Sequence, residues 1–425
     1  MSSSIRDQRA GHSHGVVDPA AEPSPAVAWF RHRAAVLLAA VVLPLTVVTV
    51  VGIVLLWPDG TGPQDHRLDR KYYAPNASIV EATIHAMRSE PCPPDDPGGP
   101  PSKSTCTKLE VRLADGPDNG RAVQADLLPQ TDRAGIQAGD RITLLQVRSS
   151  GQHDTYVFID FVRDVPMALL AGLYAVVVIG VAGLRGFRAL VGLGFAYLML
   201  AIFMLPALLE GKSPLLVGLA GSTAIMIVVL YFAHGISGRT TTALLGTLFG
   251  LGITGGLATV ATNVSQLTGL QREDDYMLMN LATSVNTSKI ILCGIIIAGL
   301  GVLNDVTITQ ASAVWELHEL SPTTSAGALF RGAMRIGRDH IASTVYTIAF
   351  AYAGAALPTL MLIELYQRPF RTAITGDNIA EEVVRTLVGS IGLVLAIPVT
   401  TAIAVAVVKT AATRRHHAGP RQQPT

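Results

Sequence analysis

Residues 299–320 read "GLGVLNDVTITQASAVWELHEL", and residues 290–298 before them read "IILCGIIIA". A helix of about 20 apolar residues has the length that crosses a bilayer core of roughly 30 Å. The run at 284–308 therefore predicts a membrane-spanning helix, and it places Asn304 and Asp305 side by side inside that helix.

The composition extends this interpretation to the whole chain. Of 425 residues, 49% are hydrophobic and 15% are charged, and the mean hydropathy is +0.42, whereas an average soluble protein has about 25% charged residues. The fold class predicted is an all-α polytopic membrane bundle of about eight transmembrane helices. Besides 284–308, the apolar runs are 34–57, 166–183, 188–209, 214–234, 240–262, 341–365 and 387–408.

A water-soluble stretch at 58–165 interrupts the apolar runs after the first of them. Its segments "SIVEATIHAM", "KLEVRLADG", "RAVQADLLP", "DRITLLQVRS" and "TYVFIDFVRD" alternate like strands between turn residues. About five strands suit a small β-barrel, of which the OB-like barrel is one form. The predicted domains are a disordered cytoplasmic tail at 1–33, an anchor helix at 34–57, the β domain at 58–165, a seven-helix membrane domain at 166–408 and a cytoplasmic tail at 409–425.

Lys and Arg predict the orientation, because they accumulate on the cytoplasmic side of a membrane. They are more frequent in the segments that face inward when both termini are cytoplasmic, and residues 58–165 are then outside a bacterial plasma membrane.

An oxidising exterior lets Cys92 and Cys106 form a disulfide, the alternative being two unpaired thiols. The net charge of +1 and the lack of a basic domain argue against nucleic acid as a partner.

Two polar stripes on consecutive spans are the candidate functional residues. A charge at the centre of a membrane helix costs about 2.5–3.5 kcal/mol, so it is a candidate for function. The helical period aligns Asp305, next to Asn304, with Thr309 and Glu316 in one stripe, and His340 with Thr344 and Thr347 in the other. We expect a proton or cation relay centred on Asp305. The alternative is a cytoplasmic helix end, where Asp305 caps the helix or meets lipid headgroups.

Three further patterns concern glycine pairs, a possible surface helix and motifs of enzymes. The pairs Gly246/Gly250 and Gly252/Gly256 favour close helix packing, although a glycine-rich helix beside a transport path would look the same. "ALFRGAMRIGRDH" (328–340) suggests a short amphipathic helix on the inner leaflet, or else a solvated loop. No Walker loop, zinc-protease helix or nucleophile elbow occurs, and two tail histidines in "GHSHG" are too few for a metal site, so we expect no enzyme, cofactor or metal.

Several long stretches resemble the YibE/F-like family of bacterial multi-pass membrane proteins. They are "LPALLEGKSPLLVGLAGS", "FAHGISGRTTTALLGTL", "GVLNDVTITQASAVWELHEL", "RIGRDHIASTVYTIAFAYAGAALP" and "EEVVRTLVGSIGLVLAIPVTTAIA". The resemblance covers roughly residues 70–408, and the N-terminal tail is similar to a shorter form of tails on actinobacterial members. It implies topology rather than an activity.

A weaker likeness concerns the protein-export SecF subunit and its resistance–nodulation–division relatives, which run on proton flow. In them, as in "GVLNDVTI", "ALFRGAMRIGRDH" and "STVYTIAF" here, an Asp-bearing helix precedes an inner amphipathic helix and a Thr/Ser-rich helix. This chain has two additional spans, so the likeness is an analogy. We expect a plasma-membrane permease or export-associated component; the alternative is a non-transporting scaffold or sensor whose outer β domain binds an envelope partner. The lipid bilayer is the main expected partner, and oligomers are compatible with either hypothesis.

Overall fold

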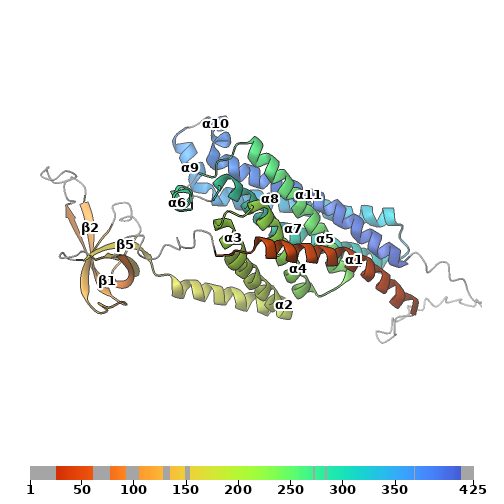
Figure 1. Cartoon of the computed structure of the whole chain (residues 1–425), viewed down its shortest axis with the longest axis horizontal. Coiled ribbons are helices and arrows are strands. Elements are labelled where there is room, and N and C mark those ends of the chain that lie inside the picture. Colours follow the sequence, from red (N-terminus) through yellow and green to blue (C-terminus); the bar gives the residue numbers. More distant parts are fainter. Residues whose placement is uncertain are drawn as a thin grey trace, which may run out of the picture. The chain divides into compact units, whose positions relative to one another are not determined.

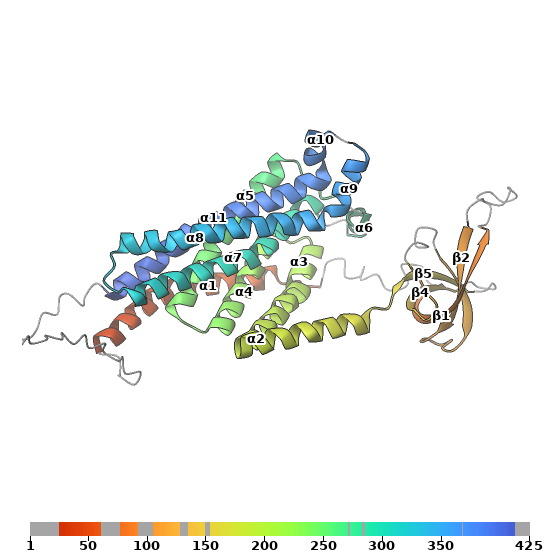
Figure 2. The same ribbon diagram turned by 180° about the vertical axis from the view of Figure 1, so that it is seen from behind.

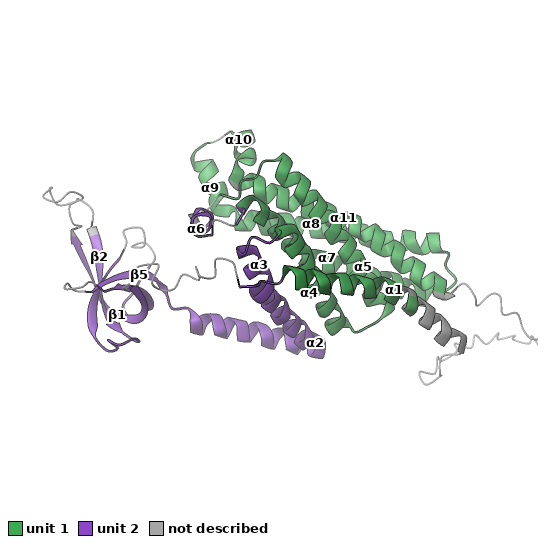
Figure 3. Ribbon diagram, viewed as in Figure 1, with its two compact units in different colours: residues 1–56, 213–271, 287–425 green, residues 57–212, 272–286 purple. Residues whose placement is uncertain are grey.

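The computed structural model describes residues 25–60, 77–91, 105–127, 135–148, 154–270, 273–282, 285–367 and 369–412. The chain divides into two compact units (Figure 3). Unit 1 comprises Met1–Leu56, Ser213–Gln271 and Thr287–Thr425, and unit 2 comprises Trp57–Lys212 and Arg272–Asn286.

A closed five-stranded barrel forms the first part of unit 2 (Figure 1). Its strands follow one another around the barrel in the order β1-β2-β3-β5-β4, and β1 also pairs with β4. The pairs are antiparallel except for β3 and β5, which meet in parallel at Asp126 and Val157. The structure thus confirms the predicted small five-stranded barrel. The strands are β1 (Ala77–Pro91), β2 (Thr105–Leu113), β3 (Ala122–Asp126), β4 (Arg141–Val147) and β5 (Thr155–Phe161).

Alternation along the strands fills the barrel core. In β4, Ile142, Leu144 and Gln146 are buried while the residues between them are less so, because successive side chains of a strand point to opposite faces. Gln146 is a polar exception in this core. Its Nε2 donates to Oδ2 of Asp154 at 2.8 Å and to the Tyr156 hydroxyl at 3.2 Å, so the buried amide is satisfied.

A broken helix follows the barrel in unit 2. It consists of α2 (Asp164–Met199), a π-helical turn (Leu200–Met204) and α3 (Leu205–Leu209). Gly183 has non-helical angles, φ 59° and ψ −137°, and a Cβ at Gly186 would lie 2.4 Å from the Val178 carbonyl oxygen. A straight helix keeps residues eight apart about 12 Å away from each other, so the chain turns back at Gly183. This break falls between the runs 166–183 and 188–209 that the sequence predicts as separate spans.

Unit 1 is a helical bundle in which α5, α7 and α11 pack against one another, α4 packs on α7, and α8 lies along α7 and α11 (Figure 2). Its elements are α1 (Pro25–Leu56), α4 (Pro214–His234), α5 (Gly238–Val264), α7 (Thr287–Leu320), α8 (Ala326–Ala355), α9 (Leu357–Leu365), α10 (Phe370–Thr375) and α11 (Asp377–Ala412). A further helix, α6 (Glu273–Leu281), belongs to unit 2 and is not anticipated from the sequence.

Several helix bounds differ from the sequence prediction. The helix α1 begins at Pro25, so residues 25–33 of the expected disordered tail are helical. The expected separate surface helix at 328–340 is instead the first part of α8. It packs against unit 1, since Leu329 and Ala333 are buried in a cluster with residues of α7 and α11. The expected span at 341–365 bends by 64° between α8 and α9, where Pro358 follows the break.

Among the described residues, six helices are long and apolar enough to cross a membrane, or seven if the bent pair α8–α9 is one span. The stretch Asp164–Leu209 is counted here as one span of 46 residues. A helix needs only about 20 residues to cross the hydrocarbon core. The break at Gly183 would allow it to cross twice. The total of eight spans therefore stays a prediction.

Candidate functional site

Asp305 and His340 come together between two neighbouring helices of unit 1. Asp305 lies midway along α7, His340 lies on α8, and Nε2 of His340 is 3.8 Å from Oδ2 of Asp305. This separation is too long for a hydrogen bond but suits an ion pair when the imidazole is protonated. The helices bring together two predicted residues that are 35 positions apart in sequence.

The pair differs in exposure. The Asp305 side chain is 71% exposed on the surface of unit 1, and that of His340 is 31% exposed. The Nε2 atom of His340 is itself buried and makes no hydrogen bond to any described residue. The carboxylate is therefore accessible from outside the bundle while the imidazole nitrogen facing it is shielded.

The predicted threonines do not bridge the two helices. The Thr309 hydroxyl donates to the Asp305 carbonyl oxygen at 2.7 Å, and the hydroxyls of Thr344 and Thr347 donate to carbonyl oxygens of their own helix. This back-bonding is usual for threonine in helices. Since each hydroxyl donates its proton to a backbone carbonyl, these residues do not connect the two members of the Asp305–His340 pair.

Two other predicted residues lie apart from the pair. Oε1 of Glu316 is 3.9 Å from Nη1 of Arg239, which is at the start of α5, and both side chains are exposed. Asn304 differs from Asp305 in burial: its Oδ1 is buried and has no hydrogen-bond partner among the described residues. Of the predicted relay residues, Asp305 and His340 form the one side-chain contact between the two helices that the described structure contains.

Unit 1 also contains a buried polar centre that the sequence pattern does not predict. Gln310 of α7 is 2% exposed, and its Nε2 donates to the Ala333 carbonyl oxygen on α8 at 3.0 Å and to the Thr401 hydroxyl on α11 at 2.7 Å. One turn away, the hydroxyls of Thr247 and Thr307 lie 2.6 Å apart. These bonds link four helices through polar groups that the low-dielectric interior makes costly to leave unpaired.

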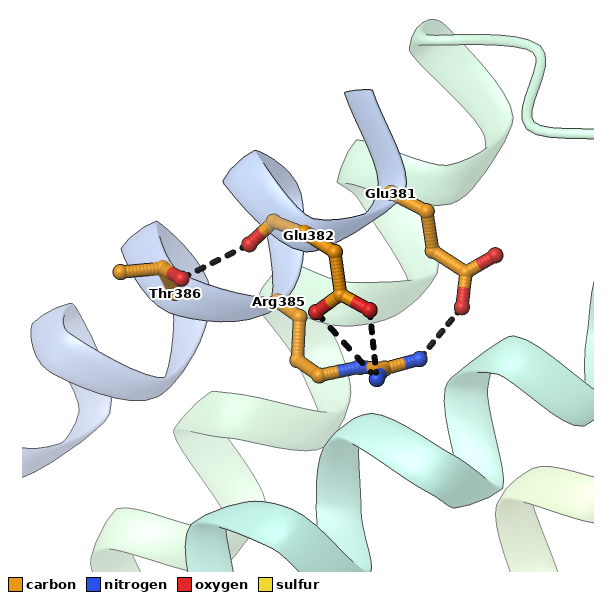
Figure 4. Close-up of polar contacts among 4 residues, drawn as sticks. All are labelled: Glu381, Glu382, Arg385 and Thr386. Atoms are coloured by element: carbon orange, nitrogen blue, oxygen red, sulfur yellow. Dashed lines mark hydrogen bonds and ion pairs between the residues drawn. The ribbon is translucent and has the colours of Figure 1, made fainter. Parts of the chain in front are cut away.

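A charged cluster at the start of α11 was not predicted either (Figure 4). Arg385 donates to Glu381 one turn earlier, and its Nη1 lies 3.3 and 3.4 Å from the two carboxylate oxygens of Glu382. All three side chains are mostly buried, and the Arg385 Nε is buried without a hydrogen-bond partner among the described residues. The signal in the sequence is Glu-Glu-x-x-Arg, which places opposite charges at i, i+3 and i, i+4 of an apolar helix.

The two glycine pairs of α5 have different surroundings. A Cβ at Gly246 would lie 1.9 Å from Thr400 Oγ1, and one at Gly250 would lie 2.6 Å from Leu303 and 3.0 Å from Ala396. These two glycines allow α5 to approach α7 and α11 closely. Gly252 and Gly256 are exposed, and a Cβ there would meet nothing within 4 Å in the described structure, so packing inside unit 1 does not require glycine at these positions.

The predicted disulfide involves a residue outside the described part of the chain. Cys92 is not described, and Cys106 lies in β2 opposite Glu90 of β1. Cys293 is a buried free cysteine on α7. Among the described residues, no group of three or more His, Cys, Asp or Glu could hold a metal ion.

The apolar helices and the small barrel define a class of protein: a multi-helix membrane protein with an added β domain. The sequence model of the YibE/F-like protein family matches residues 170–410. The chain therefore belongs to the YibE/F-like family, and the match covers α4, α5, α7, α8 and nearly all of α11. No curated protein and no solved structure matches the chain.

Proposed function

We propose that this chain is a permease or an export-associated component of the bacterial plasma membrane, in which unit 1 moves protons or another small cation. Both termini would be cytoplasmic, and the five-stranded barrel, which would be an OB-like fold, would be outside. Asp305 would be the protonatable centre and His340 the group that exchanges a proton with it.

The observation that carries this proposal is the 3.8 Å contact between His340 and Asp305. A carboxylate midway along a 34-residue apolar helix is costly in lipid, and such residues are rare unless they pair or serve a pathway. Asp and His are groups that change charge when their surroundings change. Their pairing across α7 and α8 means that a shift between these helices would alter the charge balance of both side chains.

The test is proton flux into vesicles that contain the full-length protein. With a pH-sensitive dye inside the vesicles and an imposed potential, the wild-type protein should carry protons faster than protein-free vesicles. Asp305→Asn should lower this flux by tenfold or more, and His340→Gln should lower it as well. Asp339→Asn is the matched control, since Asp339 is an exposed carboxylate next to His340 in sequence. Wild-type proton flux no greater than that of empty vesicles would refute proton movement through unit 1.

The exposure of Asp305 favours one alternative, a scaffold or sensor in which a partner protein covers this face. A carboxylate that is 71% exposed in a span is stabilised when another polypeptide shields it from lipid. A photo-reactive amino acid in place of Thr309, on the same exposed face, distinguishes the two functions. Cross-links to another protein, together with normal behaviour of Asp305→Asn in flux assays, would favour the scaffold.

A further inference from the structure

A groove lies between α8, α9 and α11 in unit 1, away from the Asp305–His340 pair. Its cavity volume is about 330 Å³, at the lower end of the roughly 300–1,000 Å³ typical of small-molecule pockets. Its walls are mainly apolar and include Ala349, Ala353, Leu360, Ile379, Val383 and Leu387.

Local sequence explains why the groove is open. Ala349 and Ala353 lie on one face of α8 near its end, Ala356 follows directly after the helix, and their small side chains leave space against α11. At the same point the chain bends by 64° into α9, which contributes Leu360 to the lining of the groove. Larger side chains at the alanines would occupy the groove.

Three polar side chains lie in this apolar wall, Glu382 and Thr386 of α11 and Tyr352 of α8, and the Thr386 hydroxyl donates to the Glu382 carbonyl oxygen of its own helix. Glu382 contacts Arg385 at 3.3 and 3.4 Å, longer than the 2.7–2.9 Å of strong charge-assisted bonds. The better partner of the Arg385 guanidinium is Glu381, on the neighbouring position of the helix (Figure 4). Glu382 therefore keeps acceptor capacity for a second cation, and Tyr352 adds an aromatic ring that also attracts cations.

We propose that this groove binds an amphipathic organic cation, with the apolar body against the alanine and leucine walls and the positive charge at Glu382. An apolar wall attracts the hydrocarbon part, and a single acidic group selects the sign of the charge. Binding at the groove requires no proton movement at Asp305. The proposal therefore stands apart from the permease function and is tested without any gradient.

The test uses two probes of the same shape and opposite charge, tetraphenylphosphonium and tetraphenylborate. Equilibrium dialysis against the full-length protein in a neutral detergent should show saturable binding of the cation, at least tenfold tighter than binding of the anion. Glu382→Gln should weaken the binding of the cation by tenfold or more. Glu319→Gln, which removes an exposed carboxylate of α7, should leave it unchanged.

A second variant covers the case in which Glu382→Gln disturbs the charged cluster. Ala353→Leu fills the groove and keeps Glu381, Glu382 and Arg385, so it should abolish cation binding in a protein that elutes as the wild type does in size-exclusion chromatography. Equal binding of the two probes, or cation binding that survives Ala353→Leu, would overturn the proposal. Absence of saturable cation binding to the wild-type protein would overturn it too.

Discussion

Gly246 of α5 faces Thr400 of α11 so closely that a Cβ atom at residue 246 would lie 1.9 Å from the threonine hydroxyl oxygen. Thr400 cannot easily turn away, because the same hydroxyl donates to the Ala396 carbonyl oxygen at 2.7 Å inside the bundle. The approach of these two helices therefore depends on the missing side chain.

We expect Gly246→Ala to destabilise unit 1 by about 1–3 kcal/mol, the usual cost of overpacking a filled core. Gly252→Ala on the same helix should be neutral or slightly stabilising, since its Cβ meets nothing within 4 Å and alanine favours a helix over glycine by roughly 0.5–1 kcal/mol. Thermal unfolding in detergent measures both variants. Equal losses of stability would contradict the difference in packing.

Gln310→Leu should destabilise the bundle by about 1–3 kcal/mol, because it removes two buried hydrogen bonds, one to the Ala333 carbonyl oxygen and one to the Thr401 hydroxyl. The neighbouring change Thr309→Ala removes only an exposed bond to its own helix. It should alter stability by less than about 0.5 kcal/mol. The same unfolding assay applies, and a Gln310→Leu variant as stable as wild type would show that the polar link is dispensable.

Tyr156 should make the stability of the barrel depend on pH in the alkaline range. Burial raises the pKa of this tyrosine above its ordinary value of 10.0, and the nearby Asp154 carboxylate raises it further. A pKa that is higher in the folded than in the unfolded state stabilises the barrel fully below pH 10. This contribution is lost as the pH rises through the folded-state value.

The measurement is thermal unfolding of a fragment spanning residues 58–163, which contains the whole barrel core. Between pH 9 and pH 11, the unfolding midpoint of the wild-type fragment should fall more than that of Tyr156→Phe. The phenylalanine variant should be less stable at neutral pH because Gln146 loses one hydrogen-bond partner. Parallel pH curves for the two fragments would rule out Tyr156 as the titrating group.

Thiol labelling tests the predicted bond between Cys92 and Cys106. Denatured protein that has not been reduced should bind one equivalent of a thiol reagent, at Cys293, the free cysteine. Reduced protein should bind three, one for each cysteine of the chain. Closing a loop of about 15 residues stabilises a fold by roughly 3 kcal/mol in the chain-entropy description, so reduction should also lower the unfolding midpoint of the barrel fragment.

Features that repeat along the chain could be predicted from the sequence. The apolar runs predict helices because a helix of about 20 apolar residues is needed to cross a bilayer. The alternation of apolar and polar residues predicts all five strands. The break at Gly183 was also expected, since it lies between two separate runs. The sequence does not predict that residues 328–340 and the following span form one helix, α8. Its arginines are typical of a separate surface helix, but Leu329 and Ala333 pack against α7 and α11.

The candidate site was harder to predict because its contacts join distant parts of the chain. Asp305 and His340 were singled out by their charge in apolar surroundings, and their contact could be expected from consecutive helices. Gln310 gave no such signal, because its partner Thr401 is 91 residues away. The sequence does not predict a binding role for Glu382, because a charged residue near a helix end is typical of a contact with water. The groove beside it depends on the packing of α8 and α9 against α11.

The closure of the barrel limits how any other molecule can attach to it. The described strands form a closed barrel, in which β1 pairs with both β2 and β4 and β3 meets β5 at Asp126 and Val157, so none of these five strands lies at the free edge of an open sheet where a foreign strand could be added. Recognition must therefore use side chains or the connecting loops. Variation among relatives at these surface positions can change the choice of partner while the barrel itself stays intact.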